Sequence, residues 1–214
     1  MEEDSAGAVS CEEKLSALEK TIGEYKADVE QFHQDLDQSS NFLQILHSRN
    51  RRDEPLTAPY TNSEADRSTY GYFRVIEQFT IEESERYEAG EETFCNIYVW
   101  DVTRAMNAEI PHMHANEIVT WLEAEGRSRG WRRVDARMAQ EMANTGHPAI
   151  AVWRNTNRNP QTGRVGPGHV AVVRPGSVGD QRGNAISAAG RYVVDAAHMQ
   201  VYFNKQGIQY WYHN

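Results

Sequence analysis

Apolar side chains recur every three or four positions in the N-terminal part of the chain. The positions are Leu15, Leu18, Ile22, Tyr25, Val29, Phe32 and Leu36, with Leu43 and Leu46 in the same register after Ser39. Alternating steps of three and four residues are the heptad pattern of a coiled coil. Because the period is about 3.5 residues and not about 3.6, it predicts a coiled coil or a helical hairpin over residues 12–50.

The composition changes on both sides of this helix. Residues 1–11 are acidic and contain no apolar run, which predicts a disordered N-terminus. Behind the helix, Pro55 and Pro59 stand among polar residues and predict a linker over residues 51–69. Residues 70–214 have a globular composition and are long enough to bury a core of their own.

Within residues 70–214, helical patterns come first and strand patterns follow. Helices are predicted from residue 94 or 95 to 106, over 116–125, and over 135–144 with Asp135 as the cap. Strands are predicted over residues 148–153, 170–173, 185–188, 192–194, 199–203 and 208–212. Helices followed by an antiparallel sheet predict an α+β domain.

A cysteine and a histidine stand at the starts of two of these elements. Thr93 can cap a helix that begins at Phe94 or Cys95, which puts the Cys95 thiol in the first turn. Backbone N–H groups and the positive end of the helix dipole favour a thiolate there, and the thiolate attacks carbonyl carbon. His169 begins a short apolar strand between Gly/Pro turns. Cys95 and His169 are therefore the parts of a nucleophile and its general base.

Three motifs carry a family resemblance. The first reads Thr-Phe-Cys-Asn-Ile-Tyr-Val-Trp-Asp-Val-Thr-Arg-Ala-Met around Cys95, the second is Glu109-Ile110-Pro111-His112, and the third reads Gly-His-Val-Ala-Val-Val-Arg-Pro around His169. Together they resemble the papain-like cell-wall amidohydrolases of the CHAP and NlpC type, most closely members found in bacteria and their phages. The resemblance covers roughly residues 72–214. It implies a papain-like fold and hydrolysis of a peptidoglycan amide through a Cys–His thioester, with no cofactor.

The sequence leaves open which bond is cleaved and which substrate is bound. Either the muramoyl-alanine amide or a bond within the stem or cross-bridge peptide would suit such an enzyme. The same residues would serve a cysteine protease, an isopeptidase or an acyltransferase that acts on another substrate. A third hypothesis is an interaction protein whose papain-like domain has lost its activity.

Other candidate site residues follow from the resemblance and from position. Ser187 occupies the place where the resembling proteins tend to carry Gln, and is favoured by position as the residue that orients the imidazole. Asp195 is the stronger acceptor chemically and is the alternative. Gln78 is a candidate for assisting the oxyanion. Trp153 and Asn155 close the strand before the histidine strand and are candidates for the wall of a substrate groove.

The charge distribution bears on partners. Of the net charge of −9, the excess acid lies entirely in residues 1–66, which hold 6 Lys/Arg against 15 Asp/Glu, whereas residues 67–214 hold 16 of each. Nucleic-acid domains usually carry a clustered basic surface, so a nucleic-acid partner is not expected. Residues 12–50 are either a spacer or a docking element, and the second alternative implies a homo-oligomer or a partner protein.

Cysteine and histidine usage leaves little room for a disulfide or a metal. Two cysteines do not make a disulfide framework, so Cys11 and Cys95 are expected to be free thiols. His112 and His114 are two residues apart and share neither a strand face nor a helix face, so no metal site is predicted.

No apolar run approaches the roughly 18 residues of a membrane span. No signal peptide is visible, which predicts cytoplasmic synthesis and release by lysis or a dedicated secretion route.

Overall fold

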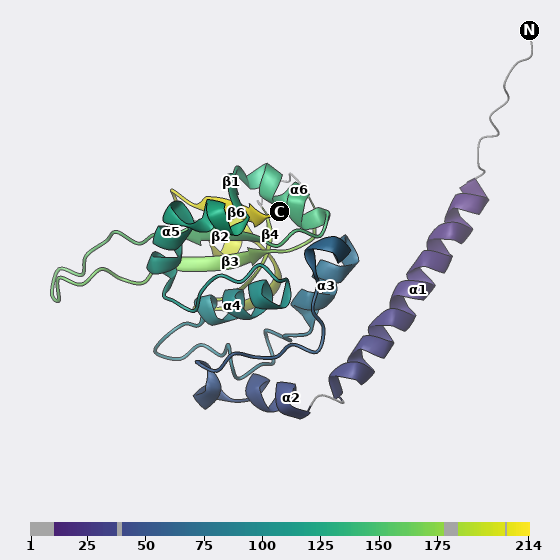
Figure 1. Ribbon diagram of the computed structural model, residues 1–214, viewed down its shortest axis with the longest axis horizontal. Coiled ribbons are helices and arrows are strands. Elements are labelled where there is room, and N and C mark those ends of the chain that lie inside the picture. The colour runs from purple at the N-terminus through teal and green to yellow at the C-terminus, as the bar shows by residue number, and fades with distance from the viewer. Residues whose placement is uncertain (1–10, 38–39, 178–183, 204) are drawn as a thin grey trace, which may run out of the picture. The chain divides into compact units, whose positions relative to one another are not determined.

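The computed structural model describes residues 11–37, 40–177, 184–203 and 205–214 (Figure 1). The chain divides into two compact units, one up to Ser40 and one over Asn41–Asn214. The predicted disorder of residues 1–11 falls outside the described residues except at Cys11. In the described part of the chain, no helix is both long and apolar enough to cross a bilayer.

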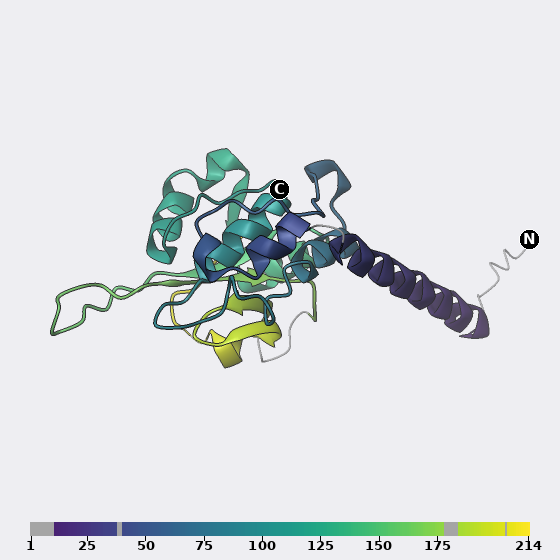
Figure 2. The same cartoon turned by 90° about the horizontal axis from the view of Figure 1, so that it is seen from below.

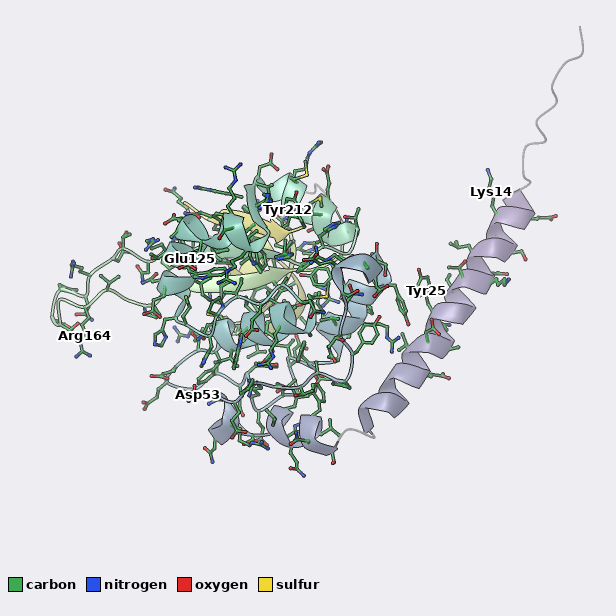
Figure 3. All side chains as sticks on the ribbon, in the orientation of Figure 1. Lys14, Tyr25, Asp53, Glu125, Arg164 and Tyr212 are labelled. Atoms are coloured by element: carbon green, nitrogen blue, oxygen red, sulfur yellow. The ribbon has the colours of Figure 1, made fainter. Side chains whose placement is uncertain are left out.

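The first unit contains one long helix, α1 (Cys11–Asp37). Leu15, Leu18, Ile22 and Tyr25 of the heptad pattern are exposed on it. Lys14 and Tyr25 are labelled among its side chains in Figure 3. The helix is shorter than the predicted range of 12–50, and its pairing into a coiled coil stays a prediction.

The second unit is an α+β domain built on one antiparallel sheet, which confirms the predicted class (Figure 1). The six strands lie in the order β1-β6-β2-β3-β4-β5. Their bounds are β1 Trp131–Val134, β2 Ala149–Trp153, β3 His169–Val173, β4 Ala185–Ala189, β5 Val193–His198 and β6 Gln209–His213. The connection between β2 and β3, which carries Arg164, extends well beyond the strands (Figure 3).

The central strands β2 and β3 form because each is a run of small and β-branched apolar residues. Ala151 pairs with Ala171 and Trp153 with His169, and the residues from Val170 to Val173 are completely buried. Helix α5 (Ala115–Ala124) contacts β2, and α6 (Ala136–Asn144) contacts β2 and β6. At the β5 edge of the sheet, α7 (Met199–Tyr202) packs against β5, and both are yellow-green in Figure 2.

Two elements differ from the predicted pattern. Residues 199–203 were predicted as a strand, but the helix α7 occupies them. The strand β1 was not predicted because two adjacent arginines, Arg132 and Arg133, interrupt its apolar alternation. It forms by pairing with β6, where Trp131 lies opposite His213 with ring centroids 5.4 Å apart.

The remaining helices are α2 (Ser40–Leu46), α3 (Thr69–Glu77) and α4 (Cys95–Ala105), with 3-10 turns at Arg49–Arg51, Glu64–Asp66 and Gly126–Arg129. Asp135 caps α6 as predicted, because its side chain accepts a hydrogen bond from the Met138 N–H at 2.8 Å. The cap of α4 is Phe94 and not Thr93, and it contributes no side-chain hydrogen bond.

The segment predicted as a linker is part of the domain. Leu56 is 3% exposed, and the Asn62 N–H donates to the Ala105 carbonyl at the end of α4 at 2.8 Å. Phe42, Ile45 and Leu46 of α2 are buried as well. Proline and polar residues are a local signal for a loop. The contacts of this segment are made with distant residues, which local composition does not reveal. The predicted domain boundary at residue 70 is therefore too late in the chain.

Candidate active site

Cys95 is the first residue of α4, a helix that is buried on nearly all sides. The Phe94 N–H donates to the Ala189 carbonyl at 3.2 Å, which fixes the start of the helix against the end of β4. The thiol is 4% exposed. Backbone N–H groups of Cys95, Asn96 and Val170 are directed at the sulfur. Because Val170 follows His169 directly, the sulfur lies beside the backbone of the predicted base.

His169 begins β3 and lies between two strands. Trp153 is its partner on β2, and Gly190, the residue after β4, lies against the ring, because a Cβ added there would be 3.0 Å from Cε1. The imidazole contacts the edge of Phe203 with ring centroids 4.6 Å apart. Among the hydrogen bonds of the described residues there is none between the Cys95 sulfur and the imidazole. The Cys95 sulfur therefore lies beside the backbone of His169 but is not hydrogen-bonded to its imidazole in the described structure.

The environment keeps both groups uncharged at neutral pH. Burial raises the pKa of the Cys95 thiol and outweighs the three backbone N–H groups, which lower it. Burial, together with the nearby Lys205 ammonium, lowers the pKa of His169 to about 4. The expectation that the helix start favours a thiolate is therefore wrong in its net direction, because desolvation of the charged sulfur is the larger effect.

The low pKa of His169 predicts a pH-dependent contribution to stability. The unfolded chain binds this proton near the ordinary pKa of 6.5, and the folded chain only near 4. Protons therefore favour the unfolded state between these values, and the free energy of unfolding should fall by up to about 3 kcal/mol from pH 6.5 to pH 4. Urea unfolding across this range should show a steeper loss for the unmodified protein than for His169→Gln. Equal slopes would contradict the buried, neutral imidazole.

The predicted orienting residues lie elsewhere. Ser187 pairs with Val172, three positions along β3 from His169, which is about 10 Å at the rise of a strand. Its hydroxyl donates to Asp195 Oδ1 at 2.6 Å and accepts from Arg174 Nη1 at 3.2 Å. Asp195 also pairs with Arg174. Ser187 and Asp195, the two candidates for the third catalytic residue, thus form a polar cluster with Arg174. The predicted site is corrected here, because neither residue is hydrogen-bonded to the described His169 ring.

Gln78 is also committed to a structural role. Its side chain is fully buried, and its amide accepts from the Tyr60 N–H at 3.0 Å and donates to the carbonyls of Tyr60 and Val75. An amide with its oxygen and nitrogen bonded in this way, and with no exposed surface, is not available to an oxyanion. Through these hydrogen bonds, Gln78 links the backbone of Tyr60 to the last turn of α3.

The two candidates for the groove wall have different positions. Trp153 is the strand partner of His169, and its ring lies 5.2 Å from the Lys205 ammonium, so it stands at the candidate site. Asn155 shapes the loop after β2. Its side chain accepts from the Asn157 N–H at 2.9 Å and donates to the Pro167 carbonyl at 3.1 Å.

Both histidines of the Pro-His-Met-His motif have structural partners. His112 stacks on Trp100 with ring centroids 4.5 Å apart. The His114 N–H donates to Glu117 at the start of α5 at 2.9 Å. Within the described ranges, no group of three metal-ligating side chains gathers anywhere.

One pocket adjoins the start of α4, and a second contains His169. The larger, of about 790 Å³, includes Phe94 and Asn96, the neighbours of Cys95, and Pro167 before His169. The smaller, of about 220 Å³, includes His169 itself together with Gly190 and Lys205. The Arg52 guanidinium lies 3.5 Å from the centre of the Phe94 ring. The segment predicted as a linker therefore helps to form the larger pocket.

Several site residues carry no sequence signal. Phe203 ends a segment predicted as a strand, Lys205 follows it, and Gly190 is one of 15 glycines. Gly190 comes to lie against the His169 ring just after β4, which pairs with β3. No protein-family model matches this chain, and no curated protein matches its sequence.

Proposed function

We propose that the domain over Asn41–Asn214 is a papain-like cysteine amidohydrolase that cleaves an amide of peptidoglycan. The observation that carries the proposal is the Cys95 sulfur at a helix start, beside the backbone of His169 and under three backbone N–H groups. The sequence resemblance supplies the substrate class. One pocket beside the neighbours of Cys95 and another that contains His169 could hold the parts of an extended substrate.

Because Cys95 and His169 are both uncharged at neutral pH, the first proton transfer runs from the thiol to the imidazole. His169, uncharged at neutral pH, takes the thiol proton as the Cys95 sulfur attacks the carbonyl carbon. The backbone N–H groups near the sulfur can then stabilise the oxyanion. When the C–N bond breaks, the imidazolium gives its proton to the leaving amine and a thioester remains. Water, deprotonated by His169, attacks the thioester, and the released thiolate recovers a proton from the imidazolium.

One observation favours the alternative of an inactive interaction protein. Among the described residues, no side-chain acceptor is hydrogen-bonded to the His169 ring, so no carboxylate stabilises the imidazolium. A dyad without an orienting residue is expected to be slower than a triad. The alternative predicts a folded protein whose Cys95 does not turn over any amide.

The deciding experiment is release of muropeptides from purified sacculi, followed by mass spectrometry. New ends are expected from the unmodified protein and from Cys11→Ser, and none from Cys95→Ala, because Cys11 lies on α1 outside the domain. The masses of the products identify the scissile bond. If a folded, unmodified protein releases nothing, wall hydrolysis is excluded, and a non-wall amide or the inactive alternative replaces it.

Gly190 offers a test of the position of His169. A Cβ added there would lie 3.0 Å from Cε1 and 3.3 Å from Nε2 of His169, so the ring must move by a few tenths of an ångström. Gly190→Ala is expected to slow hydrolysis about tenfold with little change in melting temperature. Gly23→Ala is the matched control, because no atom lies within 4 Å of its added Cβ. An unchanged rate for Gly190→Ala would argue against His169 as the base.

A further inference from the structure

The pocket that contains His169 carries positive charge. Arg191 and Lys205 line it together with Tyr192, Tyr202 and Phe203. Lys205 packs its ammonium against the ring of Trp153, the strand partner of His169. In the described part of the chain, neither Arg191 nor Lys205 forms an ion pair with a carboxylate. Two cations that have no acidic partner among the described residues thus line a pocket of about 220 Å³ that also contains the predicted base.

The larger pocket, which Phe94 and Asn96 line, has the opposite charge. The carboxylates of Asp53, Glu91, Glu92 and Glu117 line it, with Arg52 as its one arginine. The Arg52 guanidinium donates to backbone carbonyls of Glu85, Arg86 and Glu88 at 2.7 to 3.0 Å, so most of its hydrogen-bonding capacity is used. An acidic pocket thus lies beside the neighbours of Cys95 and a basic pocket contains His169, so a substrate with an asymmetric charge that reaches both would bind in one direction.

We propose that Lys205 and Arg191 form a binding site for a carboxylate of the substrate, next to His169. The inference rests on the proposed function, because it assigns one side of the scissile amide to this pocket. Both side chains would act as specificity residues, since they contact a group of the substrate that does not react. A guanidinium and an ammonium are the side chains that bind carboxylates through charge-assisted hydrogen bonds.

The position of Lys205 gives carboxylate binding a second effect. The ammonium disfavours a proton on His169, and a bound carboxylate would offset that charge. A substrate with a carboxylate at this position would therefore make His169 a stronger base at the moment it is needed. A neutral substrate would leave the base as weak as it is in the free protein.

Two small alkylating reagents test the site without a wall substrate. Iodoacetate and iodoacetamide form the same bond to sulfur and differ in charge, and peptide mass spectrometry distinguishes modification at Cys95 from that at Cys11. The ratio of the iodoacetate rate to the iodoacetamide rate at Cys95 is expected to fall at least about threefold in Lys205→Glu and in Arg191→Glu. Lys26→Glu on α1 makes the same change in net charge and should leave the ratio unchanged. Added salt should reduce the preference in the unmodified protein.

An equal ratio in the unmodified protein, Lys205→Glu and Arg191→Glu would overturn the proposal. If Cys95 is too buried to react with either reagent, the His169 ring-proton resonance is followed by NMR during addition of acetate or acetamide. Acetate alone is expected to shift the resonance, and Lys205→Glu should abolish the shift; no difference between the two additives overturns the site. Failure to cleave sacculi together with a charge-dependent response would reject wall hydrolysis and retain the carboxylate site.

Discussion

Replacing His169 with Gln is expected to lower the rate of wall-amide hydrolysis by about a thousandfold. The Cys95 thiol is buried and has a raised pKa, so it cannot supply a thiolate at neutral pH without a base. In the proposed mechanism His169 is also the acid for the leaving amine and the base for water, so one substitution would remove three proton transfers. Initial rates of muropeptide release measure the effect, with substrate concentration varied to separate kcat from KM.

His147→Gln is the matched control for this prediction. His147 lies in the same domain, its ring hydrogen-bonds to Thr145, and burial lowers its pKa as well, but it lines neither pocket beside Cys95. It should retain full activity. A His169→Gln variant with more than about a tenth of the activity would show that another group takes the thiol proton.

The resting state can be checked separately from turnover. If Cys95 and His169 were an ion pair, alkylation of Cys95 would be fast and nearly constant over a wide range around neutral pH. Because both groups are neutral here, the iodoacetamide rate should rise steadily from pH 7 to pH 9, and His169→Gln should change it by less than about threefold. A plateau that disappears in His169→Gln would contradict the neutral pair.

The sequence predicted correctly that Cys95 stands at the start of a helix and His169 at the start of a strand. A helix start and a strand start are local features, and the apolar runs that follow Cys95 and His169 determine them. The third residue depends on the register between two strands. In the observed register Ser187 lies opposite Val172, and the residue beside the His169 ring is Gly190, three positions further along.

The order of elements was predicted for the same reason, and the domain boundary was not. Periodicity identifies helices and strands, whereas the burial of Leu56 and the contact of Asn62 with Ala105 depend on residues far along the chain. Polar composition around Pro55 gave no sign that Arg86 would bind the backbone at residues 51 and 54. Nothing in the spacing of Arg86 and Asp101 indicates that they meet.

That buried pair carries the largest expected effect on stability. Arg86 and Asp101 have fully buried side chains, and the guanidinium donates to the Asp101 carboxylate through Nε at 2.7 Å and Nη2 at 3.0 Å. Tyr87 donates to the same carboxylate at 2.8 Å. Arg86 also donates to the carbonyls of Arg51 and Glu54. The pair therefore joins α4, which carries Cys95, to the segment that forms the larger pocket.

Asp101→Ala is expected to lower the free energy of unfolding by about 3–5 kcal/mol, because it leaves a guanidinium buried without its counter-charge. Urea unfolding followed by tryptophan fluorescence measures the change. Glu141→Ala removes the acid of the exposed Arg137–Glu141 pair and should cost less than about 0.5 kcal/mol. The double variant Arg86→Met/Asp101→Leu should be more stable than Asp101→Ala, since neither charge is then buried. If the double variant is the less stable protein, the backbone bonds from Arg86 to residues 51 and 54 contribute more than the ion pair, and the attachment of that segment dominates the stability of the domain.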